Sequence, residues 1–149
     1  MGRKITMAAL REIQEDHDRW VSTVGSEGRC ANLSEVNLRG IKLYNVNLNN
    51  ADLSGTDLRS ANLSGADLRS VYLWYGADLS ESDLTKANLF NSNLRGVKQK
   101  GADLRDAQGL TIEQLRETKT LYKTRLGPDL MKQVQEEYPG LLEKPNPEE

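Results

Sequence analysis

The 149-residue chain has few of the side chains that build an ordinary globular core. Aromatic residues make up 5% of it, with one phenylalanine and two tryptophans, and apolar residues of all kinds make up 37%. A chain this poor in large side chains is either partly disordered or builds its core by repetition. Its length suggests one domain.

The sequence also lacks the marks of several cellular settings. A single cysteine, Cys30, cannot form an internal disulfide, which favours a reducing compartment, and we expect a cytoplasmic location. No apolar stretch approaches the roughly 20 residues of a membrane-spanning helix, and residues 1–10 do not resemble a signal peptide. The net charge of -2 gives no strong field that would favour nucleic acid or an anionic membrane.

Catalytic and metal-binding residues are scarce as well. The one histidine, His17, lies three residues before Trp20 in a predicted helix, where a packing or surface role is expected. Cys30 has no second cysteine or histidine beside it that would complete a metal site. The sequence contains no phosphate loop, dinucleotide fingerprint or nucleophile elbow. We therefore predict no catalytic residues, no cofactor and no metal.

What the sequence does contain is a repeat of five residues. Sixteen pentads run from residue 31 to residue 111, with one residue inserted near Gly76, and all but those centred on Gln99 and Gly109 have a central leucine. The fourteen central leucines are Leu33, Leu38, Leu43, Leu48, Leu53, Leu58, Leu63, Leu68, Leu73, Leu79, Leu84, Leu89, Leu94 and Leu104. A period of five fits neither a helix nor a strand. It is typical of a chain that turns a corner in every pentad and points its leucines inward.

The residues before each leucine repeat too. The residue two positions earlier is small or β-branched throughout, and the residue directly before the leucine is Asp or Asn in twelve of the sixteen pentads. A small inward residue lets the walls of the coil close. Asp and Asn suit tight turns because their side chains bond to nearby backbone groups. We therefore predict that the outward carboxylates stabilise turns and are not ligands.

This pattern resembles that of the pentapeptide-repeat family, whose motif reads A(D/N)LXX. Residues 52–55 (Asp-Leu-Ser-Gly) and 61–65 (Ala-Asn-Leu-Ser-Gly) match the motif directly. The resemblance covers about half of the chain. It implies an all-β solenoid, a right-handed quadrilateral β-helix with four pentads in each coil and therefore about four coils.

Both ends of such a body expose leucines and unpaired strand edges, so they need caps. We predict an N-terminal helical cap, the β-helix, a C-terminal helical cap and a disordered acidic tail, over residues 1–30, 31–110, 111–142 and 143–149. Because both ends are capped, we expect a monomer.

The caps can be placed more closely. An amphipathic helix is expected from about residue 3 to residue 23, with five candidate inward residues: Ile5, Ala9, Ile13, Trp20 and Val24. At the other end, Thr111 is expected to N-cap a helix that contains Ile112, Leu115 and Leu121, and Pro128 to begin a second helix.

Binding is thus the predicted function, and the outward residues suggest where. Tyr72, Trp74 and Tyr75 crowd the point where the repeat is interrupted, with Arg95 in the next coil. Aromatic and arginine residues are enriched at interaction hot spots, and bulges often mark functional sites. Local packing around the insertion is the alternative interpretation of this cluster.

A second face carries a basic stripe of Arg39, Arg59 and Lys100. Such a stripe could meet an anionic partner. Asp57 and Asp78 lie close by in the sequence pattern, however, and a solvated face of mixed charge is favoured.

The sequence therefore predicts a non-catalytic scaffold or interaction module with an unidentified protein partner, and no small-molecule, nucleic-acid or membrane partner. The resemblance implies two alternatives: a gyrase-protecting mimic of duplex DNA, or a regulatory inhibitor of a signalling factor. Mimicry of DNA needs a long acidic rod, whereas residues 31–110 hold nine acidic and nine basic residues. The neutral, short body disfavours that role.

Overall fold

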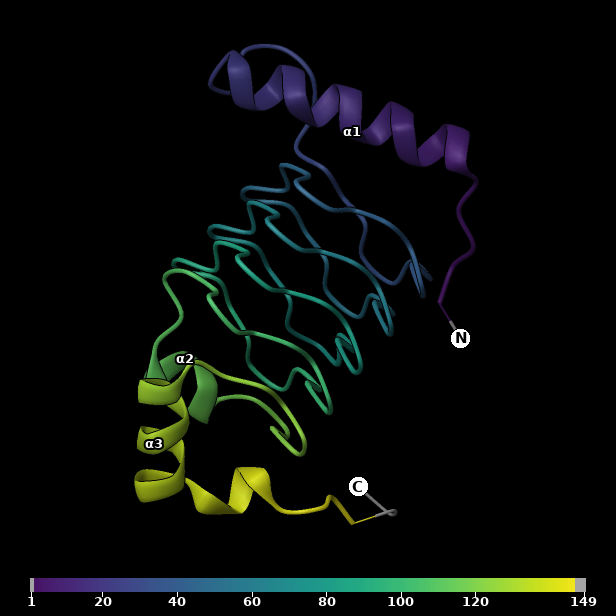
Figure 1. Cartoon of the computed structure of the whole chain (residues 1–149). Coiled ribbons are helices and arrows are strands. Elements are labelled where there is room, and N and C mark those ends of the chain that lie inside the picture. The colour runs from purple at the N-terminus through teal and green to yellow at the C-terminus, as the bar shows by residue number, and fades with distance from the viewer. Residues whose placement is uncertain (1, 147–149) are drawn as a thin grey trace.

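The structure, a computed structural model, describes residues 2–146 and consists of a stack of coils between helices (Figure 1). The helices are α1 (Met7–Ser22), α2 (Ile112–Arg116), α3 (Pro128–Glu137) and the 3-10 helix η1 (Pro139–Leu142). Helix α1 lies across the N-terminal end of the stack, and α2 and α3 lie at the opposite end. Between them the chain forms isolated parallel β-bridges from coil to coil. We call this stack of bridged coils the ladder.

The bridges define the register of the coils. Asn32 pairs with Asp52, and Asp52 pairs with Tyr72, so four pentads complete one coil. Where a bridge spans the inserted residue the spacing is one residue longer, as from Tyr72 to Asn93, and past it the original spacing returns, as from Asp78 to Lys98. Each coil therefore has four faces, and one pentad from every coil stacks on each face.

The leucines fill the axis, as the repeat predicted. All fourteen central leucines are at most 4% exposed, and most of the small residues two positions before them are buried as well. Backbone hydrogen bonds tie the coils together, since the amide of every central leucine except Leu94 donates to a carbonyl of the next coil. The Leu63 amide, for example, donates to the carbonyl of Asp83 at 2.7 Å. Burial and backbone pairing thus both repeat with the pentad.

The Asp and Asn residues before the leucines stabilise the turns, which confirms the predicted role. In all twelve pentads that have one, the Oδ1 atom accepts a hydrogen bond from the amide two residues later. The amide of Ser54, for example, donates to Asp52 at 2.9 Å. These bonds satisfy corner amides that face away from the neighbouring coils.

The predicted inward residues of the N-terminal cap are confirmed in part, since Ile5 and Ile13 pack against the core. Helix α1 begins after Thr6, whose side chain accepts from the Ala9 amide, and its buried residues are Leu10 and His17. Val24 was expected inward but is 95% exposed, because the helix ends at Ser22 before reaching it. The first coil explains why His17 points inward. Because no coil lies above the first coil, the Ala31 amide has no carbonyl partner there and donates to His17 Nδ1 at 3.1 Å.

The burial of His17 predicts a pH-dependent stability. Burial lowers the pKa of His17, and the opposing effect of nearby Asp18 is smaller. The unfolded chain then takes up this proton at a higher pH than the folded chain. The stability that neutral His17 contributes is therefore complete above the unfolded pKa of about 6.5 and is lost as the pH falls through the folded pKa, by at most about 1.4 kcal/mol per pH unit.

The chain has one histidine, so an NMR titration of its ring protons reports this residue alone. We expect a midpoint below 6.5, and we expect urea unfolding of His17→Gln to lose less stability between pH 7 and pH 5.5 than wild type does. A midpoint at or above 6.5 would contradict the burial argument.

The ladder does not end at residue 110, so the predicted boundary between body and C-terminal cap is wrong. Lys98 bridges Thr120, and Asp103 bridges Arg125, which places Leu121 and Leu126 in the axis. Leu121 therefore belongs to the coil and not to the helix predicted to contain it. Helix α2 interrupts the pentads before they resume, and this hides the continuation from a search at period five.

The C-terminal helices begin where they were predicted. Thr111 N-caps α2 in a capping box with Gln114, and Pro128 is the first residue of α3. The Gln114 Nε2 atom also donates to the Leu89 carbonyl at 2.9 Å, which ties α2 to the ladder. The Leu121 amide donates to the carbonyl of Leu141 in η1 at 2.7 Å. Of the predicted tail, residues 143–146 follow η1 without regular structure, and residues 147–149 lie outside the described residues.

Candidate functional site

The structure brings Tyr72, Trp74, Tyr75 and Arg95 onto one face, and we call these four residues the aromatic patch. Tyr72 bridges Asn93, which puts Arg95 in the coil next to the three aromatic residues. Tyr72, Trp74 and Tyr75 are 51%, 48% and 79% exposed. The rings of Trp74 and Tyr75 meet edge to face, with centroids 6.0 Å apart. The patch thus offers apolar surface to solvent beside a cation.

The inserted residue pushes the corner of the coil outward at this patch. Tyr75 and Gly76 follow each other with φ of 62° and 82°, and only glycine adopts the second of these without strain. In the coil above, the corresponding amide of Gly55 donates to the Trp74 carbonyl at 3.1 Å. Within residues 2–146, the amides of Tyr75 and Gly76 have no such partner.

Arg95 differs from most arginines of the ladder in its pairing. Three pentads contain Asp-Leu-Arg, and in each the guanidinium binds the carboxylate two residues earlier: Arg59 on Asp57, Arg69 on Asp67 and Arg105 on Asp103. Arg95 lies two residues after Asn93, as Arg39 lies two residues after Asn37. Each asparagine side chain accepts a hydrogen bond from the backbone amide of its arginine and none from the guanidinium. In the described part of the chain, the guanidinium of Arg95 has no hydrogen bond or ion pair. It is an exposed, available cation.

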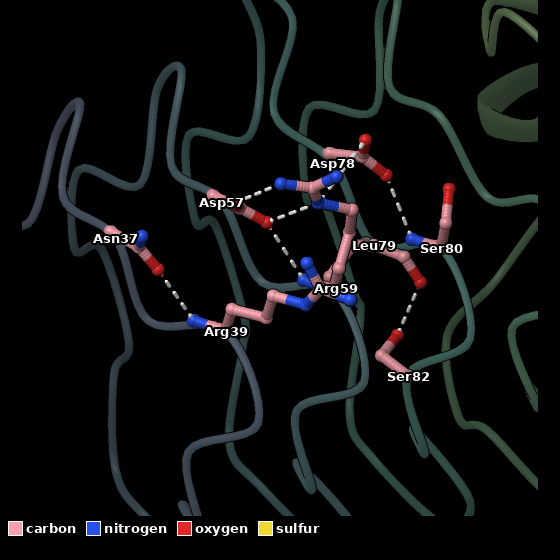
Figure 2. A network of polar contacts seen from close by, with 8 residues as sticks. All are labelled: Asn37, Arg39, Asp57, Arg59, Asp78, Leu79, Ser80 and Ser82. Atoms are coloured by element: carbon pink, nitrogen blue, oxygen red, sulfur yellow. Dashed lines mark hydrogen bonds and ion pairs between the residues drawn. The ribbon is translucent and has the colours of Figure 1, made fainter. Parts of the chain in front are cut away.

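The basic stripe also lies on one face, as predicted, and carboxylates lie beside it; Figure 2 shows Arg39 and Arg59 with Asp57 and Asp78. Arg59 donates from Nε to Asp57 Oδ1 at 2.7 Å and lies 3.9 Å from Asp78. Its hydrogen bond lowers the pKa of Asp57, which therefore stays ionised, and Asp57 in turn raises the pKa of Arg59. The carboxylates leave this face with mixed charge, and Lys100 lies two coils beyond Arg59.

The two residues considered for chemistry are both engaged elsewhere. His17 is fully buried in α1, and the Cys30 thiol donates to the Asn50 carbonyl at 3.2 Å. Burial raises the pKa of Cys30, so little reactive thiolate forms near neutral pH. Among residues 2–146, no group of three His, Cys, Asp or Glu residues could hold a metal ion, and no helix is long and apolar enough to cross a bilayer.

A groove that the sequence did not signal lies between α1 and the first coil. It has a volume of about 680 Å³, and its walls include Met7, Arg11, Asp18, Lys42 and Tyr44. These walls carry charges of both signs together with exposed apolar side chains such as Met7 and Tyr44. The groove therefore indicates no particular ligand, and the aromatic patch remains the more specific feature.

A family model for pentapeptide repeats matches residues 31–73 and 75–108 in eight copies. The chain belongs to the pentapeptide repeat family. The one unmatched residue between the two stretches is Trp74, so the family pattern breaks at the aromatic patch. No curated protein matches this chain by sequence.

Solved structures of pentapeptide repeat proteins are similar to this chain. One from the thylakoid lumen of Arabidopsis thaliana is 24% identical, covering 70% of this chain and 74% of that one, with a TM-score of 0.54. Rfr23 from the cyanobacterium Cyanothece 51142 is 35% identical, covering 66% of this chain and 54% of its own, with a TM-score of 0.44. The family match and the Arabidopsis thaliana structure show that this chain folds as a right-handed quadrilateral β-helix.

Proposed function

We propose that this pentapeptide repeat protein is a non-catalytic module that binds a partner protein through the aromatic patch. The observation that carries the proposal is the exposure of three large aromatic side chains close together on one face of the ladder, whereas Tyr44 and Phe90 are exposed singly on other faces. Trp and Tyr contribute large contact areas to interfaces and dominate many of their hot spots.

Packing alone does not account for the three aromatic side chains. The axis beneath them is already filled, since Val71 and Leu73 are at most 1% exposed. The inserted corner needs glycine at position 76 but makes no demand for Trp or Tyr before it. Residues that are about half exposed or more contribute little to folding, so a partner is the better explanation of these three large side chains.

Replacing Trp74 and Tyr75 together by alanine should leave the fold intact and abolish partner binding. Exposed substitutions of this kind change stability by about 0.5 kcal/mol or less, whereas truncating an interface hot spot costs about 2 kcal/mol or more, or roughly 30-fold in affinity. Wild type and variant would be used as baits in a lysate of the organism that makes the protein. Retained proteins would be identified by mass spectrometry and their affinities measured with purified components.

The matched control is the double variant Tyr44→Ala, Phe90→Ala, which removes two aromatic residues of similar exposure, 62% and 56%, from other faces. A partner held by wild type and by this control, and lost from the folded Trp74/Tyr75 variant, supports the proposal. A Trp74/Tyr75 variant that aggregates or melts much lower would assign the patch to packing.

The charge of the ladder argues against mimicry of DNA. Residues 31–110 carry equal numbers of acidic and basic residues, and ion pairs such as Arg59 with Asp57 bring opposite charges together on the surface. A DNA mimic needs an excess of exposed negative charge along its length, because the phosphate backbone it imitates carries one charge per 1.7 Å of axis. Regulation of a signalling factor remains compatible with the proposal, as one form of partner binding.

A further inference from the structure

Arg95 is the one cation of the aromatic patch, and its availability has an identifiable cause. In an Asp-Leu-Arg pentad the carboxylate captures the guanidinium, as Asp67 captures Arg69 with a hydrogen bond of 2.5 Å to Nη2. Asn93 stands where that aspartate would be, and a neutral amide does not hold the guanidinium of Arg95. The arginine beside the aromatic residues is thus left for another acid.

Two backbone donors lie in the same patch. The amides of Tyr75 and Gly76 have no hydrogen-bond partner within the described residues, because the inserted residue moves this corner out of the ladder. Amide donors and a guanidinium together suit a carboxylate, which accepts several charge-assisted hydrogen bonds at once. The aromatic rings beside them suit apolar side chains on either side of that carboxylate.

We propose that the partner presents an acidic side chain, Asp or Glu flanked by apolar residues, to Arg95 and the Tyr75–Gly76 corner. The inference rests on the proposed function and names the chemistry of the segment that the patch would recognise. The positive charge of Arg95 favours an acidic side chain by charge complementarity. The exposed aromatic rings favour a protein segment in which that acid has apolar neighbours.

Two acidic residues of the chain itself lie near Arg95. Glu113 and Glu117 of α2 line a cleft of about 300 Å³ together with Arg95, but neither lies within ion-pair distance of it among the described residues. Glu117 instead lies 3.4 Å from Arg116. Removing both negative charges should therefore strengthen the binding of an acidic segment.

The test uses a phage library of random 12-residue peptides, selected on the full chain and depleted on the Trp74→Ala, Tyr75→Ala variant. We expect the enriched peptides to share an Asp or Glu next to an aromatic or aliphatic residue. An enriched peptide would then be synthesised and titrated by fluorescence anisotropy. Its affinity should fall with added salt, because exposed charges are screened.

Two variants separate the role of Arg95 from general damage. Arg95→Gln removes the cation, and Asn93→Asp keeps it but creates the Asp-Leu-Arg pentad that captures arginine elsewhere in the ladder. Both variants should bind the enriched peptide with an affinity lower by about tenfold or more. The matched controls Arg39→Gln and Asn37→Asp alter the same kind of pentad on another face and should change nothing, and Glu113→Gln, Glu117→Gln should tighten binding.

Two results would overturn the inference and still leave the patch as a binding surface. One is a set of enriched peptides without an acidic residue, and the other is equal peptide affinity for wild type and Arg95→Gln. If no peptide distinguishes wild type from the Trp74/Tyr75 variant, the proposed function fails and the inference fails with it.

Discussion

Replacing Leu63 by lysine is expected to prevent the chain from folding. Leu63 is fully buried in the axis, and the backbone bonds of Leu43 to Asn62 and of Leu63 to Asp83 place leucines directly above and below it. An ammonium group there has no partner, and burying an unpaired charge costs several kcal/mol even after relaxation. Native domains have only about 5–15 kcal/mol of stability, so this one change is enough to unfold the body.

Far-UV circular dichroism and gel filtration would measure the loss. Tyr44→Lys is the control, because Tyr44 follows Leu43 on the same face but points outward and is 62% exposed. It should fold normally. The variant Leu63→Ala should fold with a loss of about 2–5 kcal/mol, the usual cost of truncating a buried leucine. A soluble Leu63→Lys protein with an unchanged spectrum would contradict the register of the coils.

Replacing Gln99 by leucine should have the opposite effect and stabilise the protein. Gln99 is fully buried, and neither its Nε2 nor its Oε1 atom has a hydrogen-bond partner among the described residues. The ladder passes through this residue, with Lys98 bridging Thr120 and with Leu79 and Leu121 on either side of Gln99 in the axis. Nothing in the structure explains a glutamine at this position.

The expected gain is about 1–3 kcal/mol, the usual penalty of a buried polar group without a partner. For a chain of this size each kcal/mol raises the melting temperature by roughly 2–4 °C. Thermal unfolding of Gln99→Leu would be compared with that of Gln108→Leu, which changes an exposed glutamine and should gain nothing. An unchanged or lower melting temperature for Gln99→Leu would show that the amide is satisfied in solution.

Features that depend on neighbouring residues were predicted well. The inward leucines follow from the period of five, and the twelve Asp and Asn turns follow from bonds that span two residues. The N-cap at Thr111 and the helix start at Pro128 are also local, since a cap satisfies backbone groups within one turn. The pairing of arginine with Asp, but not with Asn, spans two residues as well, although the sequence alone did not reveal its consequence for Arg95.

The sequence by itself determined the repeat, the inward residues and the position of the aromatic patch, because each is set by contacts within a pentad or between pentads in a fixed register. The tertiary structure alone decided the rest. It added Leu10 and His17 to the inward face of α1 beside the predicted Ile13, because the open edge of the first coil offers His17 the Ala31 amide. It also continued the ladder past α2, through pairings such as Lys98 with Thr120 that join residues more than twenty positions apart. The repeat predicts contacts of that span only where the pentads are unbroken, and α2 breaks them between residues 111 and 117.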